Sequence, residues 1–239
     1  MSTILQVNDL SISFGGIKAV QHVSFDVEQG EILGLIGPNG SGKSTCVNLI
    51  SGAYLPDTGT VIFDGTLLKE KDSIAARAKM GMGRTFQTPR PFGNLSVHMN
   101  IYTVALQKHN PAEAAKKTEE ILEFTGLSQY KDMKSSKISI EKRKWMDLAR
   151  ILALDAKFIM MDEVMAGLNP SEMESCVALV KKINESGVTI LFIEHIMKAV
   201  LSVCNRVLVL NEGKLLCQGE PEQVLRRQDV IDAYLGRQE

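Results

Sequence analysis

The 239-residue sequence is poor in cysteine and in aromatic residues, and it has no excess of charge of either sign. The cysteines form no CxxC pair and no metal-type spacing, so we expect reduced thiols that are mostly buried as small hydrophobic side chains. With 27 Lys and Arg against 28 Asp and Glu, the formal net charge is −1. This balance disfavours general binding of polyanions, and we expect no nucleic-acid partner. The four cysteines are Cys46, Cys176, Cys204 and Cys217.

Long hydrophobic runs are also missing. The longest stretch without charge, residues 91–107, contains Pro91, Gly93 and Asn100, which a membrane-spanning helix of about 20 apolar residues would not carry. The N-terminal segment MSTILQVNDL has no basic region followed by an apolar run, so it does not predict a signal peptide. Hydrophobic residues make up 44% and charged residues 23%, which is typical of globular proteins and excludes a disordered or collagen-like chain. We therefore expect a globular protein that is made and kept in the cytosol.

Two kinds of strand pattern occur. Near the N-terminus, apolar and polar residues alternate in part over 4–7 and 10–14, and cleanly over 23–27, as in antiparallel strands with one face toward solvent. Elsewhere the apolar residues are continuous, as in strands covered on both faces. Because helical segments separate these continuous runs, we expect them to form the parallel sheet of an α/β core. The continuous runs are 32–36, 158–161 and 188–193.

The middle of the sequence, residues 89–156, shows helical patterning without a convincing strand. Residues 111–124 are rich in Ala, Glu and Lys, and Gly126 is placed to end a helix there. Residues 141–154 predict a second helix. We interpret this block as a helical subdomain inserted into the α/β core.

The remaining residues complete the predicted domain. We expect 1–88 and 157–239 to form the α/β core, within one domain spanning 1–239. Two short segments near the C-terminus, 220–227 and 230–235, are expected to close the chain as helices.

Residues 37–44, GPNGSGKS, fit the phosphate-binding pattern G-x-x-x-x-G-K-[ST] of a P-loop. In such a loop the backbone N–H groups converge on phosphate oxygens, and the missing side chains of Gly40 and Gly42 let the backbone come close. Lys43 would bring positive charge to the β- and γ-phosphates, the Ser44 hydroxyl would coordinate Mg²⁺, and the following helix would point its N-terminus at the phosphates. The residues expected to contact the nucleotide here are Gly37, Pro38, Asn39, Gly40, Ser41, Gly42, Lys43, Ser44 and Thr45.

Two acids follow the apolar run 158–161. Asp162 and Glu163 would lie at the carboxyl end of a parallel strand, where α/β folds bind ligands. Asp162 can hold Mg²⁺, and Glu163 can accept a proton from an attacking water. His195 likewise follows an apolar run, so these polar groups are expected to converge on one γ-phosphate. Together with the P-loop, they predict hydrolysis of a nucleoside triphosphate.

These motifs make the sequence resemble the ATP-binding cassette (ABC) ATPases of ABC transporters, over essentially the whole chain. The resemblance implies an α/β fold of the P-loop NTPase, ABC type, with a mixed sheet core of parallel and N-terminal antiparallel strands and an inserted helical subdomain. It implies that Asp162 and Glu163 are the Walker B acid and the catalytic base, and that His195 is the switch histidine. It further implies that Gln87 contacts Mg²⁺ and couples to membrane subunits, and that Phe14 stacks on adenine.

Shorter stretches resemble the ATPases of branched-chain amino acid importers. This likeness implies a subunit that binds ATP and Mg²⁺ and hydrolyses ATP to power uptake of hydrophobic amino acids or a related small solute. The implied partners are a second ATPase subunit in a homo- or heterodimer, transmembrane permease subunits and a solute-binding protein. The implied location is cytoplasmic, peripheral on the inner face of the cell membrane through the permeases. The stretches are FGGIKAV (14–20), GRTFQ (83–87), AGLNP (166–170), IEHIMK (193–198) and VIDAYLG (230–236).

One departure from the family lies in its signature segment. The family typically has LSGGQ before a helix, whereas residues 138–142 read ISIEK, which keeps Ser139 and replaces both glycines. In the family this segment contacts the γ-phosphate bound by the opposite subunit, so Ser139 is expected to contact nucleotide there. A carboxylate at ~5 Å from ATP with an effective dielectric constant near 20 would cost about 3 kcal/mol. We therefore expect Glu141 to point away from ATP, held by the helix N-terminus and one of the three basic residues that follow it.

A second departure is Val164, which replaces the proline that usually follows the glutamate and must be held by packing instead. The basic stretch 131–150, with seven Lys or Arg and three Asp or Glu, is expected to be a solvated helical face. The altered signature leaves two alternatives open. It is a working variant, or this subunit is a slow, nucleotide-gated partner of a second ATPase subunit. A soluble ABC ATPase outside transport, acting on DNA or ribosomes, is a further alternative.

Overall fold

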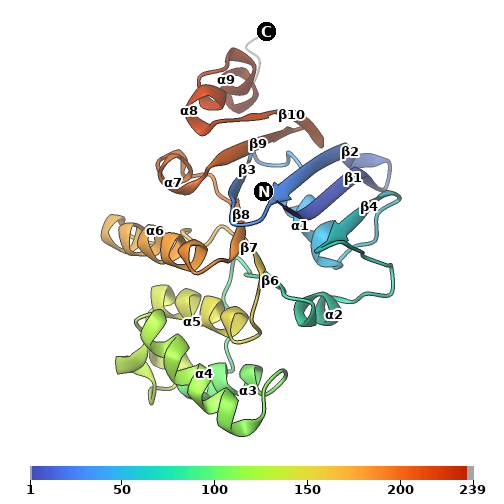
Figure 1. Ribbon diagram of the computed structural model, residues 1–239. Coiled ribbons are helices and arrows are strands. Elements are labelled where there is room, and N and C mark those ends of the chain that lie inside the picture. The colour runs from blue at the N-terminus through green and yellow to red at the C-terminus, as the bar shows by residue number, and fades with distance from the viewer. Residues whose placement is uncertain (1, 236–239) are drawn as a thin grey trace.

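The structure is a computed structural model, and it describes residues 2–235 (Figure 1). One sheet is antiparallel, with the strand order β2-β1-β4-β5. Its strands are β1 (Thr3–Phe14), β2 (Ile17–Glu28), β4 (Thr58–Phe63) and β5 (Thr66–Leu67). The other sheet has the order β10-β9-β3-β8-β7-β6 and is parallel except where β10 pairs with β9. Its strands are β3 (Ile32–Ile36), β6 (Met82–Arg84), β7 (Phe158–Asp162), β8 (Thr189–Ile193), β9 (Arg206–Asn211) and β10 (Lys214–Gly219).

Helices cover both sheets and form the middle of the chain. The helices of the described residues are α1 (Lys43–Ser51), α2 (Ile74–Lys79), α3 (Val97–Ala105), α4 (Pro111–Phe124), α5 (Ile140–Leu152), α6 (Pro170–Glu185), α7 (Met197–Val203), α8 (Pro221–Leu225) and α9 (Gln228–Leu235). Between residues 2 and 235, no helix is long and apolar enough to cross a membrane.

Two apolar cores lie on the two faces of the parallel sheet. On one face, α1 packs between the two sheets, where Val47 and Ile50 meet Leu35 and Phe158 among fully buried side chains. On the other face, α6 and α7 pack against the same sheet (Figure 1). Every residue of β3, β7 and β8 is buried, as their continuous apolar sequences predict. The mixed architecture expected from the sequence is therefore present.

The helical block α3–α5 lies at one end of the molecule and has its own apolar core (Figure 1). The predicted helix 111–124 is present with the same ends as α4, and the predicted helix 141–154 is present as α5, which begins one residue earlier and ends two residues earlier. Sequence reasoning did not predict strands β4, β5, β6, β9 and β10, although β9 contains the apolar run Val207–Leu210. It placed the closing helices within one to two residues of α8 and α9. Gly236, the last residue of the VIDAYLG stretch, lies outside the described residues.

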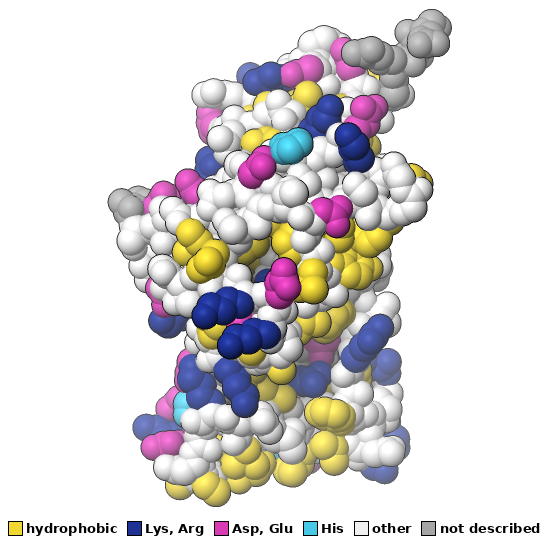
Figure 2. Space-filling view, turned by 90° about the vertical axis from the view of Figure 1, so that its right-hand side faces the viewer, with side chains coloured by type: hydrophobic (Ala, Val, Ile, Leu, Met, Phe, Trp, Pro, Cys, Tyr) yellow, Lys and Arg dark blue, Asp and Glu magenta, His cyan; other side chains and the backbone are white. Residues whose placement is uncertain are grey.

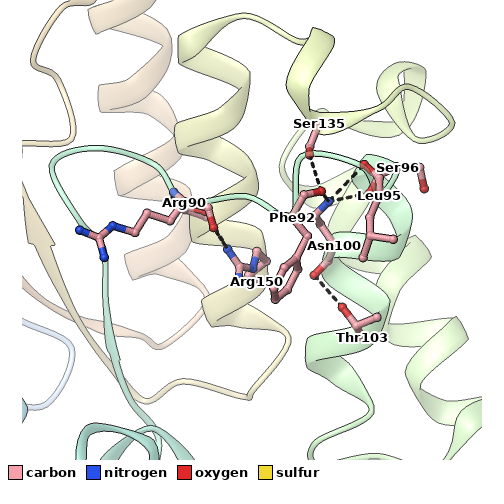
Figure 3. Close-up of polar contacts among 9 residues, drawn as sticks. Arg90, Phe92, Leu95, Ser96, Asn100, Thr103, Ser135 and Arg150 are labelled. Carbon is pink, nitrogen blue, oxygen red and sulfur yellow. Dashed lines mark hydrogen bonds and ion pairs between the residues drawn. The ribbon is translucent and has the colours of Figure 1, made fainter.

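The segment that enters this block is tied to it by a buried asparagine (Figure 3). Asn100 on α3 is fully buried; its Oδ1 accepts the Phe92 N–H at 2.8 Å, and its Nδ2 donates to the Ser96 carbonyl at 2.9 Å. Arg150 on α5 donates to the Arg90 carbonyl at 3.0 Å. The residues immediately after Gln87 are therefore fixed to the helical block rather than to the sheets.

Candidate functional site

The phosphate-binding motif forms the turn between β3 and α1. Gly37, Gly40 and Gly42 all have positive φ, which side-chain-bearing residues rarely adopt. A Cβ on Gly42 would lie 2.5 Å from the carbonyl oxygen of Ala19, whereas a Cβ on Gly40 would meet no atom within 4 Å. Gly42 is thus required by its fit against β2, and Gly40 leaves the mouth of the turn open, which is the side on which a phosphate can approach.

Lys43 lies within this turn. Its ammonium donates to the carbonyl oxygens of Gly37 at 2.7 Å and Pro38 at 2.9 Å. Burial lowers the pKa of Lys43, and the charges of Glu163 and Asp162 oppose that shift. The lysine is therefore close enough to both predicted acids to sense their charge.

Asp162 is the last residue of β7 and is buried. Its N–H donates to the Thr85 hydroxyl at 3.0 Å, and its Oδ2 lies 3.3 Å from Nη2 of Arg84. Burial raises the pKa of Asp162, and the Arg84 guanidinium opposes the shift. Arg84 also donates to Asn48 Oδ1 on α1 at 2.6 Å, so it joins the helix of the P-loop to the carboxylate. Sequence reasoning missed Arg84, although it lies three residues before Gln87.

Glu163 follows directly and has the left-handed backbone conformation, with φ of 48°. Its N–H donates to the Ile193 carbonyl at 2.9 Å, which ties it to the end of β8. The Gln87 side-chain amide donates to Glu163 Oε2 at 2.5 Å, and Nδ1 of His195 lies 4.0 Å from Oε1. Three predicted site residues from different parts of the sequence thus meet at one carboxylate.

A cavity of about 530 Å³ lies over the P-loop. Its lining combines residues 39–45 with the Glu163 carboxylate and includes Glu212. Phe14 does not line this cavity within the described chain; it is 44% exposed and packs edge-on against Tyr54, with ring centroids 5.4 Å apart. Ser139 is also outside it, exposed at the start of α5, where its hydroxyl accepts the Lys142 N–H at 3.2 Å. Both residues are accessible to a ligand or partner, and neither meets the other site residues.

The segment after Glu163 is held by two buried ionisable residues. Glu194 Oε1 accepts the Met165 N–H at 2.9 Å, and Lys144 Nζ donates to the Ala166 carbonyl at 2.5 Å. The prediction of a solvated basic face over 131–150 is therefore wrong at Lys144, because that side chain crosses to this segment and is buried. Val164 is buried in an apolar cluster, as the loss of proline requires. Sequence reasoning did not predict that Glu194 is buried and holds the Met165 N–H, because the sequence around His195 does not show whether an acid there is buried or exposed.

Glu141 lies in the first turn of α5 and is buried. Its Oε1 lies 3.2 Å from Lys142 Nζ, and this ammonium also stands 3.5 Å from the centre of the Trp145 ring. The carboxylate thus has one of the three basic partners considered from the sequence.

The three residues predicted from the sequence to hold magnesium carry ligands of the type that this ion prefers. The Ser44 hydroxyl, the Gln87 amide oxygen and the Asp162 carboxylate are hard oxygen ligands, and Mg²⁺ usually takes one or two carboxylates together with substrate phosphates and waters. Within residues 2–235 there is no cluster of three or more His, Cys, Asp or Glu side chains that would hold a metal ion on its own.

Comparisons with known proteins agree with this geometry. The protein-family model described as ABC transporter matches residues 20–166. The chain is 34% identical to the high-affinity branched-chain amino acid transport ATP-binding protein BraF of Pseudomonas aeruginosa, with 98% of each chain covered. It is 35% identical to the corresponding protein LivG of Salmonella typhimurium, again over 98% of each chain. The crystal structure of the ADP conformation of MJ1267, an ATP-binding cassette of an ABC transporter, has a TM-score of 0.89 at 31% identity and covers 99% of this chain and 100% of that one.

Proposed function

This chain belongs to the ABC transporter family as an ATP-binding subunit, and we propose that it powers uptake of branched-chain or other hydrophobic amino acids, or of a related small solute. Its similarity to ATP-binding proteins of branched-chain amino acid transport extends over 98% of its length. The observation that carries the proposed chemistry is that the P-loop and Glu163 line one cavity, while Gln87 and His195 converge on the same carboxylate.

We propose the following roles in phosphoryl transfer to water. Lys43 and the loop amides neutralise the phosphates, which is the main task in this chemistry. Glu163 orients the attacking water and accepts its proton, and His195 steadies the γ-phosphate. Ser44, Gln87 and Asp162 would hold Mg²⁺, which supplies charge neutralisation at the phosphate oxygens when bound.

The same proposal assigns the parts of the chain. Residues 1–88 and 157–239 form the nucleotide-binding core, and 89–156 form the helical subdomain. Phe14 would stack on adenine. Ser139, exposed at the start of α5, would contact the nucleotide held by a second ATPase subunit.

A groove between the core and the helical block is the proposed contact with the permeases. It has a volume of about 330 Å³ and is lined by apolar residues from α2, α3 and α5, among them Ile74, Val104 and Ile151, and by Phe86 next to Gln87. Four arginines also line it, namely Arg77, Arg84, Arg90 and Arg150. Figure 2 shows hydrophobic and basic side chains gathered in the middle of the face that carries α2 and α3. Arg77 is buried, and Arg84 and Arg150 pair with Asp162 and Asp147 of this chain, so it is the apolar part of the lining that suits an apolar permease segment. Through this contact with the permeases, the subunit would lie in the cytoplasm, against the inner face of the membrane. A solute-binding protein would be a further partner of the same transport system.

Glu163→Gln tests the proposed base, and Glu212→Gln is its matched control because Glu212 lines the same cavity. We expect Glu163→Gln to bind ATP with unchanged affinity and to lose turnover by about 100-fold or more, since general-base catalysis contributes about 10²–10⁴. Turnover of Glu212→Gln should stay within about twofold of the unsubstituted protein, because no proton transfer depends on that acid. In vesicles that also hold the permeases and the solute-binding protein, uptake of labelled leucine should fall with turnover. Unchanged turnover in Glu163→Gln would remove Glu163 from its role, and ATP-driven turnover without leucine uptake would point to a different solute.

A further inference from the structure

The C-terminal helix α9 reaches back to the phosphate-binding loop. The hydroxyl oxygen of Tyr234 on α9 accepts the N–H of Gly37 at 2.7 Å, a contact between residues 197 apart in the sequence. Figure 1 shows α8 and α9 at the end of the molecule opposite α3–α5, close to β9 and β10. The contact therefore links the nucleotide site to a part of the fold outside the residues assigned to catalysis above.

Gly37 is the first residue of the loop, and its surroundings make its orientation consequential. Its φ is +146°, and a side chain at this position would overlap the carbonyl of Leu210 on β9. Its own carbonyl accepts the Lys43 ammonium at 2.7 Å. The Tyr234 hydroxyl and the Lys43 ammonium thus hold the two polar groups of one residue at the point where β3 becomes the P-loop.

Packing seats the helix that carries Tyr234, whose own side chain is 38% exposed. Val230, one turn earlier on α9, is 2% exposed and belongs to an apolar cluster with Ile36, the last residue of β3, and Val209 on β9. The helix that carries the tyrosine is therefore seated on the same strand that delivers the loop. Burial of the hydroxyl raises the pKa of Tyr234.

The same helix also meets the start of α7. Met197, Ile231 and Tyr234 line one apolar groove, and Met197 lies two residues after His195. Helix α9 is thus in contact with the segments that carry two of the proposed phosphate-binding groups, the P-loop and the switch histidine.

We propose that Tyr234 is a positioning residue for nucleotide binding: by accepting the Gly37 N–H it holds the first peptide of the P-loop in the orientation that aims the later amides at the phosphates. This inference rests on the proposed ATP site. A loop held in its binding conformation loses less conformational freedom when the ligand arrives. The contribution of Tyr234 therefore belongs to ATP affinity and not to the chemical step, because its hydroxyl touches the loop backbone and no reacting group.

Tyr234→Phe tests the assignment, since it removes one oxygen and keeps the ring against its apolar groove. We expect the Kd and the KM for ATP to rise together by about 3- to 10-fold, the range that follows from losing a hydrogen bond, with kcat within about twofold. Hydrogen exchange of the Gly37 amide should become faster. The matched control is Tyr102→Phe on α3, which removes a hydroxyl from the helical block and should leave all four quantities unchanged.

The outcomes separate this inference from the proposed function. If the unsubstituted protein binds no ATP, the proposed function fails. If it binds ATP and Tyr234→Phe binds equally well, the positioning role of Tyr234 is wrong. A fall in kcat that matches a fall in the folded fraction, with KM unchanged, would also overturn it, because that pattern reports a merely structural tyrosine. All measurements are made on the full chain below its unfolding transition.

Discussion

Replacing Asn100 with alanine removes the side chain that ties residues 92–96 to helix α3, and the contacts in Figure 3 allow its cost to be worked out. The Phe92 N–H loses its partner at 2.8 Å, which costs about 1–2 kcal/mol for a partly buried donor. The Ser96 carbonyl loses the Asn100 amide but keeps the helical N–H of the same residue, so that loss is smaller, about 0.5–1 kcal/mol. The free energy of unfolding should therefore fall by about 1.5–3 kcal/mol, a decrease in Tm of about 3–12 °C for a chain of this size.

Urea unfolding of the Asn100→Ala variant measures this cost with two signals. Fluorescence of Trp145, the one tryptophan of the sequence, reports on α5 in the helical block, while far-ultraviolet circular dichroism reports on the whole chain. The matched control is Thr103→Val on the same helix, because its hydroxyl donates to helical carbonyls of Met99 and Asn100, and its loss should cost less than about 0.5 kcal/mol.

The reasoning is refuted if Asn100→Ala costs less than about 1 kcal/mol, since that is the worth of a single ordinary hydrogen bond. It is also refuted if Thr103→Val costs as much as Asn100→Ala, because the loss would then report on α3 as a helix. A fluorescence transition that precedes the dichroism transition in Asn100→Ala would show that the helical block unfolds first.

Two further substitutions probe buried acids. Glu194 is 1% exposed, and burial raises its pKa above the ordinary value of 4.5, so the folded state keeps a proton that the unfolded state releases. Its contribution to stability is therefore fully present below pH 4.5 and is lost as the pH rises through the folded-state pKa. Glu194→Gln should gain stability relative to the unsubstituted protein as the pH rises above 4.5, measured by urea unfolding. A stability difference that does not depend on pH would contradict this. Glu141→Gly restores a glycine of the family signature, and if the present signature is a working variant, ATP hydrolysis should change by less than about threefold while the free energy of unfolding falls by about 0.5–1 kcal/mol. A gain in hydrolysis of about tenfold or more would show that the acid slows the composite site.

Local sequence patterns were enough to predict where most of the candidate site residues lie. A P-loop is a run of eight residues whose glycines and lysine act within one turn, so residues 37–44 could be recognised without any tertiary contact. The three continuous apolar runs predicted buried strands, and their carboxyl ends placed Asp162, Glu163 and His195 at one edge of a sheet. Family resemblance supplied Gln87, whose contact with Glu163 is present in the structure.

What only the tertiary structure decided are the contacts between residues that no local pattern relates. The pairing of Arg84 with Asp162, the burial of Lys144 against the Ala166 carbonyl and the contact of Tyr234 with Gly37 each join different elements. The physical reason is that strand order, helix orientation and burial follow from the packing of the whole chain. A charged or polar side chain has the same sequence signature whether it faces water or crosses a core to meet a backbone group, and only the assembled fold distinguishes the two.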